Sequence, residues 1–587
     1  MVRAEEKHRV DPSKKRARVA VIGSGIAGQT AAWLINRKHD VVALYEASER
    51  PGLHVRSINL DGFGPVDVPL RAYSPHYYPN LWRLYQTLGI KSQPVNYSST
   101  GSHYPTGASY FQYYNLLILR RAIPFLWGRQ FTLFSFLVTL RIVRDLLWMV
   151  FVGPLFLMKG GKALQGKSLD QYLKEENFSN DFVHSFLYPV MSTLLSCSYE
   201  QVAGYPAEYI LQFYSSRSTT LLTGWHKVPD GVEAVSEQLL RDLPPGALRL
   251  GVKVLSVTSK LDSKGMSVVE VVDANGNTET FDHVIIATEP NIARYLWKDQ
   301  LPQEAELFET MASFTADIVV HTDAGLMPVD RSNWSGMNYF CSPTHGAGGV
   351  AQTAASLDKT KMNASMTSVW VNRYSAPDSV SQASRASRSE VIQVVKKTSR
   401  RSSTPNGCFR APLTTIRQRQ LQLASSSTAS KKMVVAADVD DDENGSNEAD
   451  LFQTWNPYSR PATGTVVAEE KMTRAVWTVA AKKVFEDNME AVQGARNVWL
   501  CGSYCSPGVT LLENAVKSAL DVSQDFGIAD LPFKPQDCYE AYWWTTIFSF
   551  LVYYWKRWVL LLLLVSVFLC QGGPSAALGA VQRLLGH

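Results

Sequence analysis

Three glycines near the start of the chain have the spacing of a phosphate-binding loop. Gly23, Gly25 and Gly28 fit the pattern G-x-G-x-x-G. In such a loop the first glycine permits a tight turn, the second lets a pyrophosphate approach the backbone, and the third lets a helix pack closely on a strand. Glu46 follows Gly25 by about 20 residues, the spacing at which a carboxylate meets a ribose hydroxyl. These residues predict a dinucleotide site, without indicating which dinucleotide.

The segments around this loop predict the elements that position it. Residues 18–22 and 41–45 are short, apolar and rich in β-branched side chains, and the segment between them carries small and apolar residues at helical spacing. The pattern predicts a strand, a helix and a second strand. The phosphates would lie at the N-terminus of the helix, where free N–H groups and the helix dipole favour anions. A βαβ unit that holds no ligand is the alternative.

Composition and charge restrict the class of protein. The chain has 587 residues, 45% of them hydrophobic, enough for two or three domains or one large composite domain. Its net charge of +5 is small, so nucleic-acid binding is not expected. The seven cysteines form no CxxC motif and no paired framework, which indicates a reducing compartment and no structural zinc. The first 17 residues lack the apolar core of a secretory signal.

Further segments predict strands and a helix that could complete the first unit. Residues 248–256, 267–273 and 280–287 have the composition of consecutive strands. Much later, residues 497–502 predict a short buried strand. After a loop that contains glycine, residues 511–526 predict a helix.

Two apolar regions raise the question of a membrane. Residues 541–570 contain two apolar runs separated by Lys556 and Arg557, with tryptophan and tyrosine crowding the first run. A spanning helix needs about 20 apolar residues. This tail therefore predicts a helix that extends beyond residue 570 or includes the charge pair by snorkelling, or else an interfacial or re-entrant hairpin. A buried core helix is the alternative. Residues 123–158 are interrupted by charges, so we expect amphipathic helices there that line a pocket or rest on a membrane surface.

One long segment departs from the composition of a folded domain. Residues 375–450 are rich in serine, arginine, threonine and lysine, then turn acidic, and contain few aromatic residues. Such a composition favours disorder, so we expect an insertion without a packed core. Its basic part could bind an acidic partner or be phosphorylated, but we favour a plain loop over either role.

The order of these motifs resembles the FAD-dependent amine oxidase superfamily. More closely, several segments look like the FAD/NAD(P)-binding oxidoreductases of that superfamily found in bacteria and fungi. The segments that carry the resemblance are RVAVIGSGIAGQTAAWLINRKHDVVALYEA, YPNLWRLYQTLGI, IVVHTDAGLMPVDRSNWSGMNY, LFQTWNPY and NVWLCGSYCSPGVTLLENAVKSAL. They cover most of residues 18–527 apart from the insertion.

The resemblance implies an α/β fold in which a Rossmann-type FAD-binding domain is interleaved with an α+β substrate domain. The apolar tail, which lies outside the resemblance, adds a C-terminal membrane helix or hairpin to this expectation. A basic N-terminal tail would occupy residues 1–17 and the membrane segment residues 541–572. The FAD-binding domain would comprise residues 18–75, 226–300 and 495–530. The substrate domain would comprise residues 76–225, 301–374 and 451–494, with the insertion at 375–450.

The resemblance also implies which residues hold FAD, in preference to NAD. They are Gly23, Gly25, Ile26, Ala27 and Gly28 at the pyrophosphate, Glu46 at the adenosine ribose, Arg50 near the phosphates, Val254 with its backbone at the adenine, Gly502 and Ser503 near the ribityl phosphate, and Glu513 and Asn514 near the isoalloxazine. Two departures add bulk close to the cofactor. Leu53 replaces the second glycine of the R-x-G-G motif, and Pro69 and Leu70 stand where backbone lies against the flavin.

No catalytic residue and no metal site can be assigned from the sequence. No Ser-His-Asp set, paired carboxylates or metal-ligand spacing is evident, which suits chemistry performed by a flavin. Cys501 and Cys505 are expected to be a buried strand thiol and a loop thiol, and not a redox pair. The polar groups that could contribute are His54, Tyr73, His76, Tyr339 and Tyr504.

These observations favour a membrane-tethered FAD-dependent oxidoreductase that acts on a lipophilic substrate by hydride abstraction, desaturation or isomerisation. The second hypothesis is an amine oxidase of a small soluble amine. The third is a non-catalytic nucleotide-binding or scaffold protein, which Leu53 and Pro69 favour. The expected partners are a lipophilic small molecule and a membrane, with no nucleic acid. With no secretory signal, the catalytic body should face the cytosol.

Overall fold

The computed structural model describes residues 16–52, 56–60, 63–75, 77–118, 121–127, 133–158, 163–215, 224–341, 361–375 and 450–536. The glycine loop belongs to a sheet of five parallel strands. Their order across the sheet is β10 (Leu248–Arg249), β2 (Asp40–Tyr45), β1 (Arg18–Ile22), β14 (His283–Ile286) and β20 (Val498–Leu500). The sheet therefore joins segments from the start, the middle and the end of the described chain.

Helices cover this parallel sheet, as a sheet with two buried faces requires. Strand β1 lies at its centre, with Val19 beside both Val41 of β2 and His283 of β14. Four of the five β1 residues are buried. The packed helices are α1 (Ile26–Ile35), α9 (Glu233–Leu240) and α16 (Leu512–Asp525), of which α1 touches both others.

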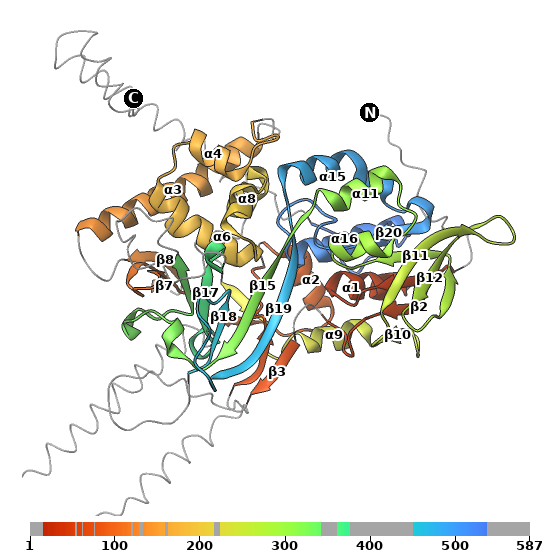
Figure 1. The fold of residues 1–587 in the computed structure, drawn as a ribbon, viewed down its shortest axis with the longest axis horizontal. Helices are drawn as coiled ribbons and strands as arrows, with labels where there is room; N and C mark the ends of the chain where they lie inside the picture. The colour runs from red at the N-terminus through yellow and green to blue at the C-terminus, as the bar shows by residue number, and fades with distance from the viewer. Residues whose placement is uncertain are drawn as a thin grey trace, which may run out of the picture.

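The largest sheet has eight strands and is mostly antiparallel. Only the pair β16–β6 is parallel among its neighbours in the described chain. Its order is β19 (Val466–Val476), β15 (Ala312–His321), β18 (Phe452–Trp455), β17 (Met366–Trp370), β16 (Met337–Cys341), β6 (Ser99–His103), β7 (Ser109–Ile118) and β8 (Arg121–Trp127). The long strands β15 and β19 run between the two halves of the molecule (Figure 1).

A group of helices lies at the end of the molecule opposite β11 and β12 (Figure 1). Buried aromatic and aliphatic side chains of these helices share one core with α1 and α16. The group comprises α3 (Leu133–Met158), α4 (Leu169–Glu175), α5 (Asn180–Phe182), α6 (Tyr188–Leu195), α7 (Tyr199–Ala203) and α8 (Ala207–Ser215).

Smaller elements complete the fold. A three-stranded antiparallel sheet contains β11 (Val254–Leu261), β12 (Ser267–Asp273) and β13 (Thr278–Phe281), and two pairs are formed by β3 (Arg56–Leu60) with β4 (Gly64–Val68) and by β5 (Gln93–Val95) with β9 (Trp225–Lys227). The remaining helices are α2 (Pro79–Thr87), α10 (Pro290–Leu296), α11 (Pro302–Glu309), α12 (Val371–Tyr374) and α15 (Val479–Val492).

The structure corrects three predictions of secondary structure. Residues 248–256 are not one strand, because Gly251 has a φ of +68° and turns the chain from β10 in the parallel sheet to β11 in the three-stranded sheet. Residues 280–287 are likewise divided between β13 and β14. Residues 123–127 belong to strand β8, and helix α3 covers residues 133–158 of that apolar region. The predicted strands at 18–22, 41–45 and 267–273 and the helix at 511–526 are confirmed.

The regions predicted to be unusual lie almost entirely outside the described residues. They are the first 15 residues, positions 376–449 of the predicted insertion, and the whole apolar tail at 541–570. Among the helices that the structure describes, none combines the length and the apolar composition that crossing a membrane requires.

Candidate functional site

The three glycines of the loop differ in what surrounds them. A Cβ atom on Gly23, whose φ is +103°, would lie 2.7 Å from the carbonyl oxygen of Ala287, and one on Gly28 would lie 2.0 Å from the carbonyl oxygen of Gly23. These two glycines therefore permit the turn and the close packing of α1 on the sheet. A Cβ on Gly25 would meet no atom within 4 Å. Gly25 thus leaves open space at the N-terminus of α1.

The carboxylate of Glu46 lies against this loop. Its Oε2 accepts hydrogen bonds from the backbone N–H and the hydroxyl of Ser24, at 3.0 and 2.6 Å, and its Oε1 accepts one from the backbone N–H of Ser48 at 2.9 Å. Ser24 in turn accepts a hydrogen bond from the backbone N–H of Gly52 at 3.1 Å. The ends of β1 and β2 are thereby held together where a ribose would lie beside a loop-bound pyrophosphate.

A cavity opens at the N-terminus of α1, and we call it the glycine-loop cavity. Its wall combines the start of α1, the chain after β14, strand β19 and the loop between β20 and α16. The lining residues are Gly25, Ile26, Ala27, Arg71, Ala287, Thr288, Glu289, Met472, Thr473, Arg474, Gly502, Ser503, Tyr504, Thr510, Leu511, Leu512 and Ala515. Residues from both ends of the predicted dinucleotide unit therefore line one space.

A second cavity, which we call the aromatic cavity, lies against the large sheet, and residues of α6 and of the start of α16 complete its wall. The rings of Tyr97 and Trp225 stack in its wall, with centroids 4.6 Å apart and planes at 16°. Its lining contains no aspartate or glutamate within the described residues. The lining residues are Pro69, Leu70, Arg71, Ala72, Tyr78, Tyr97, Val190, Thr193, Leu194, Ser196, Trp225, Met337, Tyr339, Val369, Tyr374, Trp455, Met472, Arg474, Leu511 and Leu512.

The two cavities share part of their walls, including the guanidinium groups of Arg71 and Arg474. Arg71 donates from Nη2 towards the Sδ of Met472 at 3.5 Å, and Arg474 donates from Nη1 to the carbonyl oxygen of Leu194 at 3.0 Å. Burial, with the neighbouring charge of Arg474 as a second cause, lowers the pKa of Arg71 to about 9. Burial also lowers the pKa of Arg474. Both side chains keep some accessible area because they line cavities.

Gln453 of β18 fixes the segment that carries Arg71. Its Oε1 accepts a hydrogen bond from the backbone N–H of Leu70 at 2.7 Å, and its Nε2 donates to the carbonyl oxygen of Asp67 at 3.0 Å. The Gln453 side chain is completely buried. It therefore replaces the backbone partner that a neighbouring strand would supply, and it couples the position of Arg71 to the large sheet.

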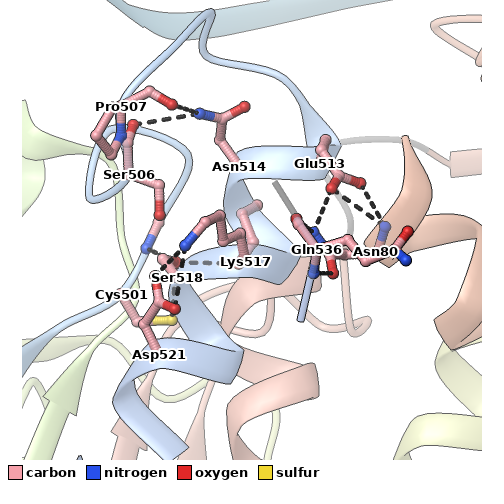
Figure 2. Close-up of polar contacts among 12 residues, drawn as sticks. Asn80, Cys501, Ser506, Pro507, Glu513, Asn514, Lys517, Ser518, Asp521 and Gln536 are labelled. Carbon is pink, nitrogen blue, oxygen red and sulfur yellow. Dashed lines mark hydrogen bonds and ion pairs between the residues drawn. The ribbon is translucent and has the colours of Figure 1, made fainter. Parts of the chain in front are cut away.

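The polar side chains at the start of α16, Glu513 and Asn514, form hydrogen bonds that the sequence did not indicate (Figure 2). The Glu513 carboxylate points to α2, where it accepts hydrogen bonds from the backbone N–H of Asn80 at 3.1 Å and of Leu81 at 3.0 Å. The Asn514 amide donates to the carbonyl oxygens of Ser506 and Pro507, at 3.2 and 2.6 Å. Neither side chain lines the glycine-loop cavity, although Leu511, Leu512 and Ala515 do. Through these hydrogen bonds the two polar residues position the loop and the helix.

Some of the other predicted cofactor residues line the glycine-loop cavity, and others line neither cavity. Ile26, Ala27, Gly502 and Ser503 line the glycine-loop cavity. Arg50 is exposed beyond β2 and lines neither cavity. Val254 is buried at the start of β11 and also lines neither cavity. Two residues before it, the backbone N–H of Val252 donates a hydrogen bond to the carbonyl oxygen of Glu46 at 2.9 Å. That strand therefore begins beside the predicted ribose position.

Only some of the candidate polar residues, and of the bulky residues that replace the family's usual ones, line the two cavities. Tyr339 lines the aromatic cavity, as do Pro69 and Leu70, and Tyr504 lines the glycine-loop cavity. Tyr73 lines neither, and its hydroxyl lies 2.5 Å from that of Ser92. Leu53, His54 and His76 lie outside the described residues.

The cysteines near residue 500 form no disulfide. Cys501, directly after β20, is buried, and Cys505 in the following loop is partly exposed. Burial raises the pKa of Cys501 to about 12 and raises that of Cys505. A raised thiol pKa opposes the thiolate form that redox exchange requires.

Sequence reasoning did not identify the two arginines of the shared wall. One signal was present for Arg474, because it follows Met472 by two residues in a strand and therefore projects from the same face as that buried side chain. A cation on the buried face of a strand is unusual. No comparable local signal marks Arg71, because the residues around it form no regular element.

The geometry suits an extended ligand that carries a diphosphate. The open space at Gly25 lies at the N-terminus of a ten-residue helix, whose first N–H groups favour a bound anion. Glu46 stands beside the loop for a hydroxyl-bearing group. The glycine-loop cavity shares the side chains of Arg71 and Arg474 with the wall of the aromatic cavity.

Comparisons with known proteins point to one family. The family model for flavin containing amine oxidoreductase matches residues 26–322. Among solved structures, the chain is similar to putrescine oxidase bound to putrescine, with a TM-score of 0.50, 11% identity, and coverage of 87% of this chain and 99% of that chain. At such identity the likeness concerns the fold alone.

Two further solved structures have similar coverage. Cyclohexylamine oxidase from Brevibacterium oxydans has a TM-score of 0.47 and 14% identity, covering 87% of this chain and 100% of that chain. A CLA-producing fatty acid isomerase from P. acnes has a TM-score of 0.48 and 12% identity, covering 88% of this chain and 99% of that chain. No protein of curated function matches the chain in sequence.

Proposed function

The chain belongs to the flavin containing amine oxidoreductase family and is an FAD-dependent oxidoreductase. From this premise we propose that the enzyme acts on a lipophilic substrate. When bound, FAD accepts a hydride equivalent from a C–H bond, and the protein supplies binding, orientation and electrostatics. The proposed reaction is hydride abstraction, desaturation or isomerisation of that substrate. We further propose that the C-terminal segment tethers the enzyme to a membrane.

The residues around the glycine loop suit the FAD that the family requires. The N–H groups at the start of α1 would hold the pyrophosphate at the open position of Gly25. Glu46 would accept a hydrogen bond from the adenosine ribose, and Gly502 with Ser503 would form the opposite wall of the cavity. The side chains of Glu513 and Asn514 have no part in this proposal, since they are turned towards α2 and towards the preceding loop.

The composition of the aromatic cavity is the observation that carries the proposed substrate class. Aromatic and aliphatic side chains form most of its wall, including the stacked rings of Tyr97 and Trp225. Apolar surface of this kind favours an apolar ligand and excludes water from it. The cavity also adjoins the one that contains the glycine loop, so a substrate there would lie next to the cofactor.

A small soluble amine is the second candidate, and one observation favours it. Stacked aromatic rings can attract a cation through their π faces, and Tyr97 and Trp225 supply such rings. Arg71 and Arg474, however, place two positive charges in the same wall, where they would repel an ammonium group. Membership of a flavoenzyme family sets the non-catalytic hypothesis aside.

The substrate class can be tested by anaerobic reduction of the flavin. The full chain is purified in detergent, and its flavin absorbance is followed as candidate substrates are added one at a time. For hydride abstraction or desaturation we expect bleaching by long-chain fatty acids, polyenes or terpenoids; for isomerisation the flavin should end oxidised, with an isomerised product found by mass spectrometry and chromatography. In either case small amines of the putrescine type should neither bleach the flavin nor be converted. Bleaching by the small amines alone would identify the enzyme as a soluble-amine oxidase.

Membrane attachment requires a separate experiment, because residues 541–570 lie outside the described structure. The proposal rests on the apolar and aromatic composition of this tail, with the catalytic body on the cytosolic side. We expect the full chain to stay with the membrane fraction after alkaline carbonate washing and to be digested by protease added to the cytosolic face. Replacing Leu561 and Leu563 by aspartate should release it, whereas replacing both by valine should not. Release of the wild-type chain by the wash would contradict an integral tail.

A further inference from the structure

Two cationic side chains come from distant parts of the chain to the boundary between the two cavities. Arg71 follows β4, and Arg474 lies in β19. Both line the glycine-loop cavity and the aromatic cavity. Their hydrogen-bond acceptors are a thioether sulfur, on Met472, and a backbone carbonyl, on Leu194. Within the described residues, neither guanidinium forms an ion pair with a carboxylate.

The charge of this pair is incompletely compensated. The Nε of Arg71 is buried and has no hydrogen-bond partner among the described residues. Asp67 acts on Arg71 electrostatically, but its Oδ1 is already engaged by the Ser57 hydroxyl at 2.7 Å and the Val232 backbone N–H at 3.0 Å. Enclosing a cation without an ionic partner is costly, so a bound anion would stabilise the arrangement.

The carboxylate of Glu289 interacts electrostatically with Arg474, and it lines the glycine-loop cavity and not the aromatic cavity. Glu289 belongs to the wall of the glycine-loop cavity and accepts a hydrogen bond from the backbone N–H of Ala475 at 3.1 Å. On the side of the aromatic cavity, the described lining has no acidic residue. The aromatic cavity is therefore apolar over most of its surface and cationic at one end.

We propose that Arg71 and Arg474 bind the anionic head group of an amphipathic substrate, a carboxylate or a phosphate, while its apolar body lies in the aromatic cavity. This inference rests on the proposed function, because it specifies the head group of the proposed lipophilic substrate. The planar guanidinium presents N–H groups in a fork that matches carboxylate and phosphate oxygens. A head group held at the boundary leaves the apolar chain among Tyr97, Trp225 and the aliphatic lining.

The phosphates of FAD are the competing anion. They already have a binding position in the space at Gly25, where the free N–H groups of α1 converge. The two arginines also face the aromatic cavity, which lacks any part of the glycine loop. The assignment to a substrate head group therefore predicts that FAD content does not depend on the arginines.

A matched ligand series tests the inference on the full wild-type enzyme. Dodecanoic acid, dodecyl phosphate, methyl dodecanoate and dodecylamine share one chain length and differ in the head group. Their dissociation constants are measured from the perturbation of the flavin absorbance below the micelle concentration of each ligand. We expect the acid or the phosphate to bind at least about tenfold more tightly than the ester, and the amine to bind most weakly, as hydrogen bonds to charged groups predict. The preferred anion identifies the head group.

Arg71→Gln and Arg474→Gln then test the assignment to these residues, with Arg71→Lys and Arg474→Lys as variants that keep the charge and lose the fork. We expect each glutamine variant to remove most of the preference for the anion over the ester. Binding of the ester should be unchanged, and the flavin-to-protein ratio should equal that of the wild type. The lysine variants should restore part of the preference.

The outcomes separate this inference from the proposed function. Binding of the ester as tightly as the acid in the wild type would overturn the anion site and leave the lipophilic substrate standing. Failure of every long-chain ligand to bind would overturn the proposed function. Loss of FAD from the glutamine variants, or an anion preference that survives in both, would assign the arginines to another role. Where the variants do not fold, the wild-type series decides.

Discussion

The carboxylate of Glu513 caps helix α2 through Asn80, although the two residues lie 433 positions apart. Both its oxygens lie 3.1 Å from the Asn80 backbone nitrogen, and Oε1 accepts a second hydrogen bond from the Asn80 side-chain amide at 2.5 Å. Leu81 supplies a further backbone N–H at 3.0 Å. The first N–H groups of a helix have no partner within it. The start of α16, beside the glycine-loop cavity, is thereby locked to α2.

Replacing Glu513 by glutamine should change how stability depends on pH. Burial, opposed by the hydrogen bonds from Leu81 and Asn80, raises the pKa of Glu513 from 4.5 to about 7. The folded state therefore binds a proton more tightly than the unfolded state, so this contribution is complete below pH 4.5 and is lost as pH rises through 7. Over that window we expect the free energy of unfolding to fall by on the order of 3 kcal/mol from this group alone.

The measurement is denaturant unfolding of the wild type and of Glu513→Gln at pH 5 and pH 8. The unfolding free energy of the wild type should fall relative to that of Glu513→Gln as the pH rises from 5 to 8. Asp67, whose pKa burial also raises, is present in both proteins and cancels in the difference. Glu490→Gln, on the exposed surface of α15, is the control and should keep the wild-type slope. An unchanged slope in Glu513→Gln would show that this carboxyl does not titrate in the window.

Alanine at Gly25 and at Gly28 should separate cofactor binding from folding. Gly25 has a φ of −64° and open space around it, so alanine should leave the melting temperature unchanged. Its methyl group would occupy the approach of the pyrophosphate, and FAD affinity should fall about tenfold or more. A Cβ on Gly28 would lie 2.0 Å from a carbonyl oxygen, so that variant should lose about 3 kcal/mol or more of stability.

Calorimetric melting and the flavin-to-protein ratio after dialysis distinguish these two results. Full FAD retention by Gly25→Ala would place the diphosphate elsewhere. A stable Gly28→Ala variant would contradict the tight contact between α1 and the carbonyl group of Gly23.

Methionine at Gln453 should destabilise the fold and disturb the cavity wall. The substitution keeps the side-chain volume similar but leaves the N–H of Leu70 and the carbonyl of Asp67 without their buried partner. Unpaired buried polar groups cost about 1–3 kcal/mol each. We expect a lower melting temperature and a weaker preference for anionic ligands, because Arg71 directly follows the released segment. Gln86→Met, on the exposed side of α2, should stay within about 0.5 kcal/mol of the wild type.

Substitution of Trp225 should affect the affinity for apolar ligands more than protein stability. Its ring is only partly buried and forms the wall of the aromatic cavity by stacking on Tyr97. Trp225→Ala removes the apolar contact between the indole ring and a lipophilic substrate. The KM for that substrate should therefore rise about tenfold. Trp225→Phe keeps an aromatic face and should raise the KM much less. Equal kinetics in both variants would place the substrate away from this wall.

Local sequence patterns predicted the elements whose residues lie close together in the chain. The strand, helix and strand around Gly23 are confirmed because apolar periodicity and glycine spacing are properties of a single segment. The same periodicity could not say which sheet a strand joins. Residues 248–256 and 280–287 were each predicted as one strand, yet each is shared between two sheets, since the partner that completes the hydrogen bonds is distant in sequence.

The sequence by itself determined the glycine loop, which depends on residue types at short, fixed spacing, and the family, which depends on the order of several such motifs along the chain. Tertiary structure alone decided which polar residues reach the cavities. It directs Glu513 to a helix terminus, and it brings Arg71 together with Arg474 across about 400 positions. The residues that a charged side chain contacts are often distant in the sequence and come together only when the whole chain folds. The role of such a side chain therefore follows from tertiary packing, and a local sequence pattern does not reveal it.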